Sequence, residues 1–343
     1  NTMNMNSIKK MMLSGALGCL ISGMAYADGS SPQPVKPYWQ DIQVVAVNKE
    51  KPRSSFMSYA DRETALTSRF EKSPYYSLLN GTWKFFFVDS YKDLPQNITD
   101  PSVNTSSWDD ITVPGNWEVQ GHGVAIYTNH GYEFKPRNPQ PPLLPEANPV
   151  GVYRRDIEIP ANWDNRDIYL HIGGAKSGLY VYLNGKEVGY SEDSKNPAEF
   201  LINKYLQPGK NVLTLKIFRW STGSYLECQD FWRMSGIERD VFLWSQPKAS
   251  IQDFRVVSTL DDTYTNGIFK LAVDLKNHTQ ETKNLNVGYE LLDAKGNLVA
   301  SEANDIWVSP ASPQTASFEY DLKNVAPWSA ESIQIIDDDK RRG

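Results

Sequence analysis

Residues 178–190 read Gly-Leu-Tyr-Val-Tyr-Leu-Asn-Gly-Lys-Glu-Val-Gly-Tyr and give the clearest hairpin signal in the chain. A strand-like run of six residues precedes Asn184-Gly185, the dipeptide that best fits a two-residue hairpin turn. A second strand is then expected to return over residues 186–190. Since such a turn joins neighbouring antiparallel strands, this stretch predicts a sheet in the middle of the chain.

Similar segments lie on both sides of this hairpin. Short aromatic or β-branched runs predict further strands at residues 81–88, 110–113, 152–159, 167–172, 212–218 and 240–244. Helical periodicity is nearly absent over this span. Strands of this number and length, with long connections, predict a jelly roll of eight or more strands over residues 77–247. Residues 28–76 are expected to form an N-terminal arm and an irregular lead-in.

A second β domain is expected after Pro247. Runs at residues 251–257, 267–276, 285–292 and 315–320 are spaced like the strands of an immunoglobulin-like sandwich, which we place at residues 248–331. Residues 332–343 form an aberrant tail that is too charged to lie inside a sandwich. We therefore expect an incomplete sandwich, produced by a frameshift or truncation. The alternative is a genuine two-domain protein with a charged tail.

The first 27 residues have the pattern of a signal peptide. A basic pair, Lys9-Lys10, precedes an apolar segment over residues 11–24, and Ala25-Tyr26-Ala27 supplies a small-x-small cleavage pattern. This arrangement predicts export to the periplasm, with cleavage after Ala27. The tripeptide that ends at Cys19 faintly resembles a lipoprotein acylation site, so a lipid anchor through Cys19 is the alternative.

The composition argues against several classes of function. The net charge is −6 and no long Lys/Arg block is present, which argues against a nucleic-acid partner. No apolar run after the N-terminus approaches the ~20 residues of a membrane span. Aromatic residues make up 12% of the chain, which fits sugar binding, although large β-sandwiches also use aromatics in their strands. The four histidines are scattered, and the sequence contains neither a nucleophile elbow nor a phosphate loop.

Residues 219–241 combine two tryptophans, Tyr225, Phe231 and several charged side chains in a stretch that ends as a strand. This run resembles the sugar-binding domain of family-two glycoside hydrolases, specifically the large bacterial β-galactosidases. The resemblance covers residues 39–331 and is most specific between Pro114 and Val241. It implies an all-β chain with a galactose-binding-like jelly roll and an immunoglobulin-like sandwich. It also implies a parent protein that hydrolyses terminal non-reducing β-D-galactose with retention.

The resemblance also shows what the sequence lacks. Family members use two glutamates on a (β/α)8 barrel, and the motifs that hold them are absent here, so no catalytic residue is assigned. We expect this chain to supply accessory contacts to a galactoside or lactose-type sugar and to be inactive alone. A stand-alone carbohydrate-binding module is one alternative, and a β-glucuronidase or β-mannosidase relative is another. Full-length relatives are homo-oligomers, and Na⁺ and Mg²⁺ are expected for the complete enzyme.

Two residues are carried over from the resemblance as sugar contacts. In Ile126-Tyr127-Thr128-Asn129 the family places a substrate-binding asparagine, which here is Asn129; its amide can donate to and accept from vicinal hydroxyls. The alternative is an Asx-turn residue that closes a loop. In Ser191-Glu192-Asp193-Ser194 the matching aspartate is Asp193, which implies a contact with a galactosyl hydroxyl and a ligand to sodium. The alternative is a solvated acid in a hairpin loop.

Four residues of the aromatic run are expected to give structural support. These are Glu227, Asp230, Trp232 and Arg233. Arg233 is expected to form a partly buried ion pair stacked on an indole, which would fix the loop near Asp193. One departure from the family pattern occurs at residues 130–133, His-Gly-Tyr-Glu, where the commoner version is apolar.

Overall fold

The chain folds almost wholly into β-strands. A computed structural model describes residues 36–134 and 138–328. Within these residues the α-helix is α1 (Arg62–Leu66), and none of their helices is long and apolar enough to cross a membrane. The expected signal peptide at residues 1–27, with Cys19, and the charged tail at residues 332–343 lie outside the described residues.

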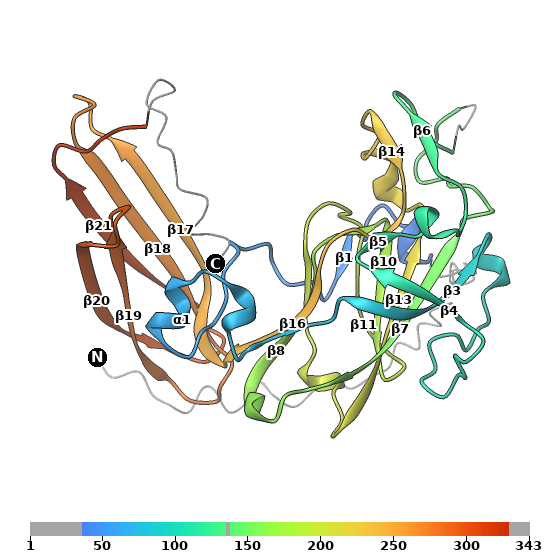
Figure 1. The fold of residues 1–343 in the computed structure, drawn as a ribbon, viewed down its shortest axis with the longest axis horizontal. Helices are drawn as coiled ribbons and strands as arrows, with labels where there is room; N and C mark the ends of the chain where they lie inside the picture. Colours follow the sequence, from blue (N-terminus) through green and yellow to red (C-terminus); the bar gives the residue numbers. More distant parts are fainter. Residues whose placement is uncertain (1–35, 135–137, 329–343) are drawn as a thin grey trace, which may run out of the picture. The chain divides into compact units, whose positions relative to one another are not determined.

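The first sandwich is a jelly roll, as the strand pattern predicts (Figure 1). Its larger sheet contains, in spatial order, β1 (Ala46–Val47), β11 (Lys186–Ser191), β10 (Gly178–Leu183), β13 (Lys210–Phe218), β7 (Val150–Glu158), β3 (Gly81–Val88) and β4 (Asp109–Val113). The smaller sheet contains β12 (Ala198–Leu201), β8 (Arg166–Ile172), β16 (Val241–Pro247) and β2 (Tyr76–Leu78). Neighbouring strands are antiparallel in both sheets.

The central hairpin joins β10 to β11 as expected. Asn184 and Gly185 have φ of +53° and +77°, which is the left-handed region that both central residues of a type I′ turn require. The side-chain amide of Asn184 also donates to the carbonyl of Tyr205 at 3.0 Å, which fixes the turn against a later loop. The local sequence therefore determines this turn, and a tertiary contact reinforces it.

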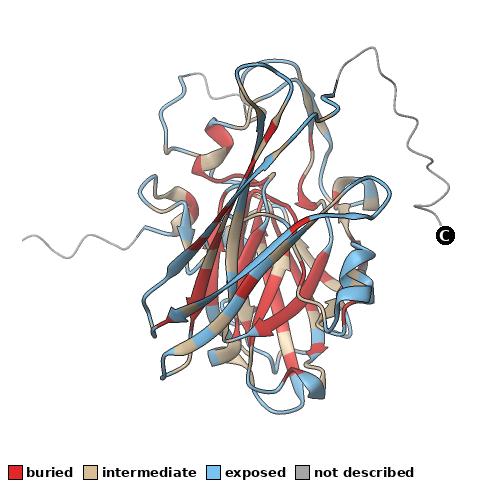
Figure 2. Cartoon of the chain, turned by 90° about the vertical axis from the view of Figure 1, so that its left-hand side faces the viewer, coloured by how far each residue is buried: buried red, intermediate tan, exposed pale blue. Residues whose placement is uncertain are grey.

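The main core fills the space between the two sheets. Alternate residues of β13, namely Leu213, Leu215 and Ile217, point into it and are at most 1% exposed. Leu170 of β8 and Leu243 of β16 reach the same core from the facing sheet. Burying a side chain of this size stabilises a fold by roughly 1.5–3 kcal/mol. Figure 2 shows that most of the buried residues lie on strands.

A second aromatic cluster packs elsewhere in the jelly roll. Trp39 stacks on Phe218 of β13 with ring centroids 5.0 Å apart, and Tyr38 stacks on Tyr180 of β10 at 5.6 Å. Trp108 belongs to the same cluster. Many of the aromatic residues therefore pack inside the jelly roll. This is the alternative explanation of the aromatic content, beside sugar binding.

Two small sheets lie beside the large ones. β6 (Ile126–Thr128) pairs with β14 (Phe231–Arg233), so that Tyr127 lies opposite Trp232 (Figure 1). A second set contains β5 (Gly115–Asn116), β15 (Gly236–Ile237) and β9 (Ala175–Lys176). These short ladders bring residues near 129 and near 233 together.

The second sandwich follows directly after β16. One sheet contains β17 (Ala249–Leu260), β18 (Gly267–Asn277) and β21 (Gln314–Leu322), and the other contains β19 (Lys283–Leu292) and β20 (Leu298–Val308). Leu271 and Val273 of β18 and Phe318 of β21 form part of its core. This arrangement fits the predicted immunoglobulin-like sandwich. The sequence predicts that the final strand of this sandwich is missing after Glu331. That part of the chain lies outside the described residues.

The strand pattern failed to predict β20. Residues 301–305 read Ser-Glu-Ala-Asn-Asp, a polar run without the alternation of a half-buried strand. In the structure β20 pairs with β19 along its whole length, from Leu298 opposite Leu292 to Val308 opposite Lys283. Backbone pairing with a neighbour therefore forms this strand where the side chains gave no signal.

Candidate sugar-contact site

Asn129 lies directly after β6, on an exposed loop. Its side-chain oxygen is 2.7 Å from Nδ1 of His130, and the hydroxyl of Thr128 donates to the carbonyl of His130 at 2.7 Å. The loop is therefore closed by its own side chains, but no backbone N–H donates to the Asn129 side chain among the described residues, so the Asx turn of the alternative is not formed there. The amide nitrogen of Asn129 has no partner among the described residues, so this group can still donate to a sugar hydroxyl.

Asp193 lies in the loop between β11 and β12, and its side chain is 49% exposed. Both carboxylate oxygens accept from the side-chain amide of Asn196 at 3.1 Å. The ammonium group of Lys49 is 4.0 Å from the carboxylate, and it donates to the hydroxyl of Ser191 at 3.1 Å. Burial lowers the pKa of Lys49, and the charge of Asp193 opposes that shift. Asp193 is therefore a carboxylate with a cation beside it.

The residue before Asp193 is buried and firmly held. One oxygen of Glu192 accepts from the hydroxyl of Tyr190 at 2.8 Å, and the other accepts from the hydroxyl of Thr222 at 2.6 Å and the amide of Gly223 at 2.8 Å. Burial raises the pKa of Glu192, although these hydrogen bonds oppose the shift. Glu192 thus attaches the Asp193 loop to the turn at residues 222–225.

The residue after Asp193 is held by Glu227. One oxygen of Glu227 accepts from the amide of Ser194 at 3.1 Å, and the other accepts from its hydroxyl at 2.7 Å. Burial raises the pKa of Glu227, against the effect of the two Ser194 hydrogen bonds. Asp193 is therefore flanked by two residues whose positions are fixed by the buried carboxylate of Glu192 and the partly buried carboxylate of Glu227.

Arg233 connects this region to the Asn129 loop. Its guanidinium donates to the backbone carbonyl of Glu227 at 2.8 Å and to the backbone carbonyl of Thr128 at 3.4 Å. Asn129 and Asp193 share no direct contact among the described residues. Their loops are joined through these two intermediate side chains.

The expected ion pair at Arg233 is wrong in two respects. Its partner at Glu227 is a backbone carbonyl and not a carboxylate, and the ring beneath its guanidinium is Phe231, 5.0 Å away, and not an indole. Trp232 points away because neighbouring residues of a strand face opposite sides, and it packs on Tyr127 with centroids 5.7 Å apart. Asp230 accepts from the hydroxyl of Tyr127 at 2.7 Å.

A buried set of charges near this site was not found from the sequence. Arg219 lies 3.7 Å from the carboxylate of Glu118 and 3.5 Å from that of Glu133, and Lys176 lies 3.5 Å from Glu133. All four side chains are nearly inaccessible. Burial raises the pKa of Glu118, while a backbone hydrogen bond from Ser235 and the charge of Arg219 oppose the shift. The departure from the family pattern expected at residues 130–133 was the available signal.

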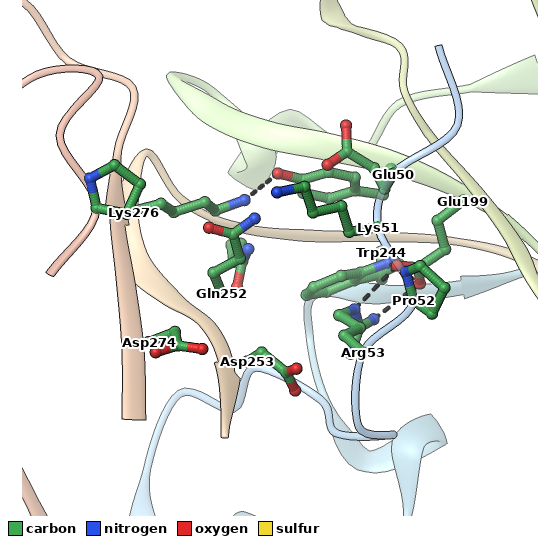
Figure 3. Close-up of a pocket in the computed structure, with 13 residues that line it drawn as sticks. Glu50, Lys51, Pro52, Arg53, Glu199, Trp244, Gln252, Asp253, Asp274 and Lys276 are labelled. Carbon is green, nitrogen blue, oxygen red and sulfur yellow. Dashed lines mark hydrogen bonds and ion pairs between the residues drawn. The ribbon is translucent and has the colours of Figure 1, made fainter. Parts of the chain in front are cut away.

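Two cavities share residues 50–53 in their lining. One has a volume of about 360 Å³, and Lys49, His171, Asp193 and Asn196 contribute to its lining. The other has a volume of about 250 Å³ and is shown in Figure 3. The first cavity places open space directly beside Asp193.

The surroundings of Asp193 do not suit the sodium ion that the resemblance implies. Hard cations gather several oxygen ligands, but the neighbours of Asp193 are the ammonium of Lys49 and the amide nitrogen of Asn196. Across residues 36–134 and 138–328 no group of three or more His, Cys, Asp or Glu could hold a metal ion. The described residues around Asp193 therefore do not form a sodium site by themselves.

Comparison with known proteins gives two family matches. Residues 76–247 match the family described as "Glycosyl hydrolases family 2, sugar binding domain", and residues 249–334 match "Glycosyl hydrolases family 2". The junction between the matches falls where β16 ends and β17 begins. Both predicted sugar-contact residues and the four support residues lie inside the first match.

Curated relatives carry the name β-galactosidase. One from Priestia megaterium is 38% identical over 303 residues, which cover 87% of this chain and 29% of that protein. Those from Psychromonas ingrahamii and Halalkalibacterium halodurans are 34% and 37% identical, covering 86% and 85% of this chain and 28% of each protein. The chain thus spans less than a third of the length of the curated relatives it matches.

Solved structures confirm the fold. A β-glucuronidase of Bacteroides uniformis aligns with a TM-score of 0.60 and 20% identity, covering 74% of this chain and 28% of that chain. A β-glucuronidase of Bifidobacterium dentium aligns with a TM-score of 0.55 and 19% identity, covering 74% and 42%. The two family matches together span most of the sequence, and on that evidence the chain belongs to glycosyl hydrolase family 2.

Proposed function

We propose that this chain provides non-catalytic sugar contacts of a retaining β-galactosidase. The observation that carries the proposal is the joining of the Asn129 and Asp193 loops inside a sugar-binding domain whose curated relatives are β-galactosidases. Residues 77–247 form the proposed sugar-contact domain, and residues 248–331 form the proposed second domain. The pattern at residues 1–27 favours export to the periplasm, and family membership favours assembly of the whole protein as a homo-oligomer.

Each residue has a proposed role that follows from its chemistry. The amide of Asn129 donates to and accepts from neighbouring hydroxyls of the galactosyl ring. The carboxylate of Asp193 accepts from a further hydroxyl, and the ammonium group of Lys49 lies 4.0 Å from that carboxylate. Hydrolysis itself, with departure of the aglycone, belongs to the whole protein. We assign no bound sodium or magnesium to the residues of this chain.

A neutral hexose fits this site better than a uronic acid. The carboxylate of Asp193 is half exposed, and it would repel the carboxylate of a glucuronide bound beside it. The likeness to solved β-glucuronidases is below 25% identity and concerns the fold alone. The charge at Asp193 and the names of the curated relatives therefore favour the galactoside.

The test is a titration of the chain with galactose, in which the amide shifts are monitored by NMR. A chromogenic β-galactoside assay accompanies it. We expect weak binding, with a Kd of about 1 mM or above, because only part of a site is present. The shifted amides should map to residues 126–130 and 191–196, and Asn129→Ala or Asp193→Ala should abolish the shifts. Asp262→Ala, an exposed acid of the second sandwich, is the matched control.

Two results would count against the proposal. Galactose shifts that map away from both loops would remove Asn129 and Asp193 from the sugar site. Turnover of the chromogenic galactoside by this chain, lost on changing one of its own residues, would show that the chain is catalytic.

A further inference from the structure

We infer that Glu227 and Arg233 are positioning residues that set the spacing between the Asn129 and Asp193 loops. This inference rests on the proposed function, because it concerns the two residues to which that function assigns the sugar. It goes further by naming two side chains that touch no sugar and yet determine whether both contacts can be made at once.

At the Asn129 end, the bridge is attached to the residue directly before the contact residue. Arg233 is 1% exposed and donates to the carbonyl of Thr128 at 3.4 Å. The β6–β14 ladder sets Arg233 opposite Ile126, and Arg219 donates to the carbonyl of Arg233 at 3.1 Å. The guanidinium therefore starts from a fixed backbone position.

At the Asp193 end, the bridge is attached to the residue directly after the contact residue. The carboxylate of Glu227 receives both the amide and the hydroxyl of Ser194. The backbone carbonyl of the same glutamate is the second acceptor of Arg233, at 2.8 Å. A single residue thus binds the Asp193 loop with its side chain and Arg233 with its backbone.

The geometry requires both side chains to be present. A guanidinium presents several N–H donors in a fixed fork, so Arg233 can bind two carbonyls from different segments at once. A lysine ammonium keeps the charge, but its three donors lie on one nitrogen and are not held in a fixed fork. Because a contact misplaced by about 1 Å can cost a site most of its effect, the spacing of the two loops decides how well one sugar fills both.

The experiment measures hydrogen exchange in the full chain, with and without galactose, by following the peptides over residues 126–130 and 191–196. The variants are Arg233→Lys, Glu227→Gln and Ser194→Ala. The matched control is Glu238→Gln, which alters the carboxylate that pairs with Lys195 at 2.5 Å nearby. Thermal unfolding is recorded for each variant, so that loss of fold is recognised.

The bridge predicts that a change at one end is felt at the other. Ser194→Ala should speed exchange at residues 126–130 as well as locally, by about three- to tenfold, the size expected for one lost hydrogen bond. Arg233→Lys should preserve folding and yet speed exchange in both loops. The double variant Ser194→Ala/Arg233→Lys should speed exchange by a factor smaller than the product of the two single-variant factors. If Arg233→Lys fails to fold, Glu227→Gln tests the same bridge from its other side chain.

Purely local responses would overturn the inference. In that case Ser194→Ala would change only residues 191–196, Arg233→Lys only residues 126–130, and the two effects would multiply. The proposed function is judged separately from the wild-type chain. If galactose protects neither loop while the variants still show coupling, the bridge stands and the sugar assignment fails.

Discussion

The guanidinium of Arg53 binds both carboxylate oxygens of Glu199, at 2.9 and 2.7 Å, across a sequence separation of 146 residues. Figure 3 shows this pair beside Trp244, whose ring lies 4.4 Å from the guanidinium carbon and whose indole N–H donates to Glu199 at 3.0 Å. His171 also contacts the carboxylate at 2.8 Å. The pair fastens the segment before the jelly roll to the smaller sheet.

Replacing Arg53 by methionine should strongly destabilise the chain. The variant leaves the buried carboxylate of Glu199 without its cation, and breaking a buried pair in this way typically costs about 3–5 kcal/mol. Urea unfolding followed by tryptophan fluorescence would measure the loss. The control is Arg62→Ala, whose partner Glu290 is solvent-exposed, so that its unfolding midpoint should not move measurably. Equal effects of the two changes would contradict the assignment of Arg53 as an anchor.

The same carboxylate predicts a loss of stability in acid. Burial alone would raise the pKa of Glu199, but the hydrogen bond from His171 and the charge of Arg53 outweigh burial and lower it. A group with a lowered folded pKa stabilises the fold above its unfolded pKa, about 4.3 for glutamate, and loses this effect as the pH falls towards the folded pKa. The free energy of unfolding should therefore fall below about pH 4 more steeply in the parent chain than in Glu199→Gln. Parallel pH profiles for the two chains would refute this origin.

The sequence predicted the elements that depend on local residue patterns, and it missed the contacts that form between segments far apart in the chain. The hairpin at Asn184-Gly185 follows from two residues, and its flanking strands were confirmed. The arm at residues 28–76 read as an irregular lead-in because the partners of Arg53 lie far along the chain. For the site, the resemblance named Asn129 and Asp193. Neither pattern nor resemblance showed that the carboxylates of Glu192 and Glu227 hold the residues on either side of Asp193, since those contacts join separate loops.

Glu192 should titrate above the ordinary range of a glutamate. Burial raises its pKa despite three hydrogen bonds, so the native chain binds more protons than the unfolded chain just above pH 4.3. Its contribution to stability is therefore present below the unfolded pKa and is lost as the pH rises through the folded pKa. The carboxyl ¹³C shift in NMR would report this pKa directly. Glu281 is the contrast, because a hydrogen bond from Lys283 lowers its pKa. A measured pKa of Glu192 below that of Glu281 would contradict the buried position of Glu192.

A core leucine and a surface leucine should respond very differently to truncation. Leu215 lies at the centre of β13 with no exposed surface, so Leu215→Ala removes packing on all sides and should cost about 2–5 kcal/mol. Leu226 is 84% exposed in the loop before Glu227, and Leu226→Ala should change stability by less than about 0.5 kcal/mol. Chemical denaturation of both variants tests the fold independently of any sugar. A small effect at Leu215 would contradict the described sandwich core.

Sodium should have no specific effect on this chain. The ammonium of Lys49 already lies 4.0 Å from Asp193, and the described neighbours of that carboxylate offer N–H donors where a hard cation needs oxygen ligands. Exchange of sodium chloride for choline chloride at constant ionic strength should leave the thermal midpoint and the amide shifts of residues 191–196 unchanged. Lys49→Met removes the competing cation and serves as the comparison. A saturable sodium-specific shift at Asp193 in the unchanged chain would show that Lys49 does not exclude the ion.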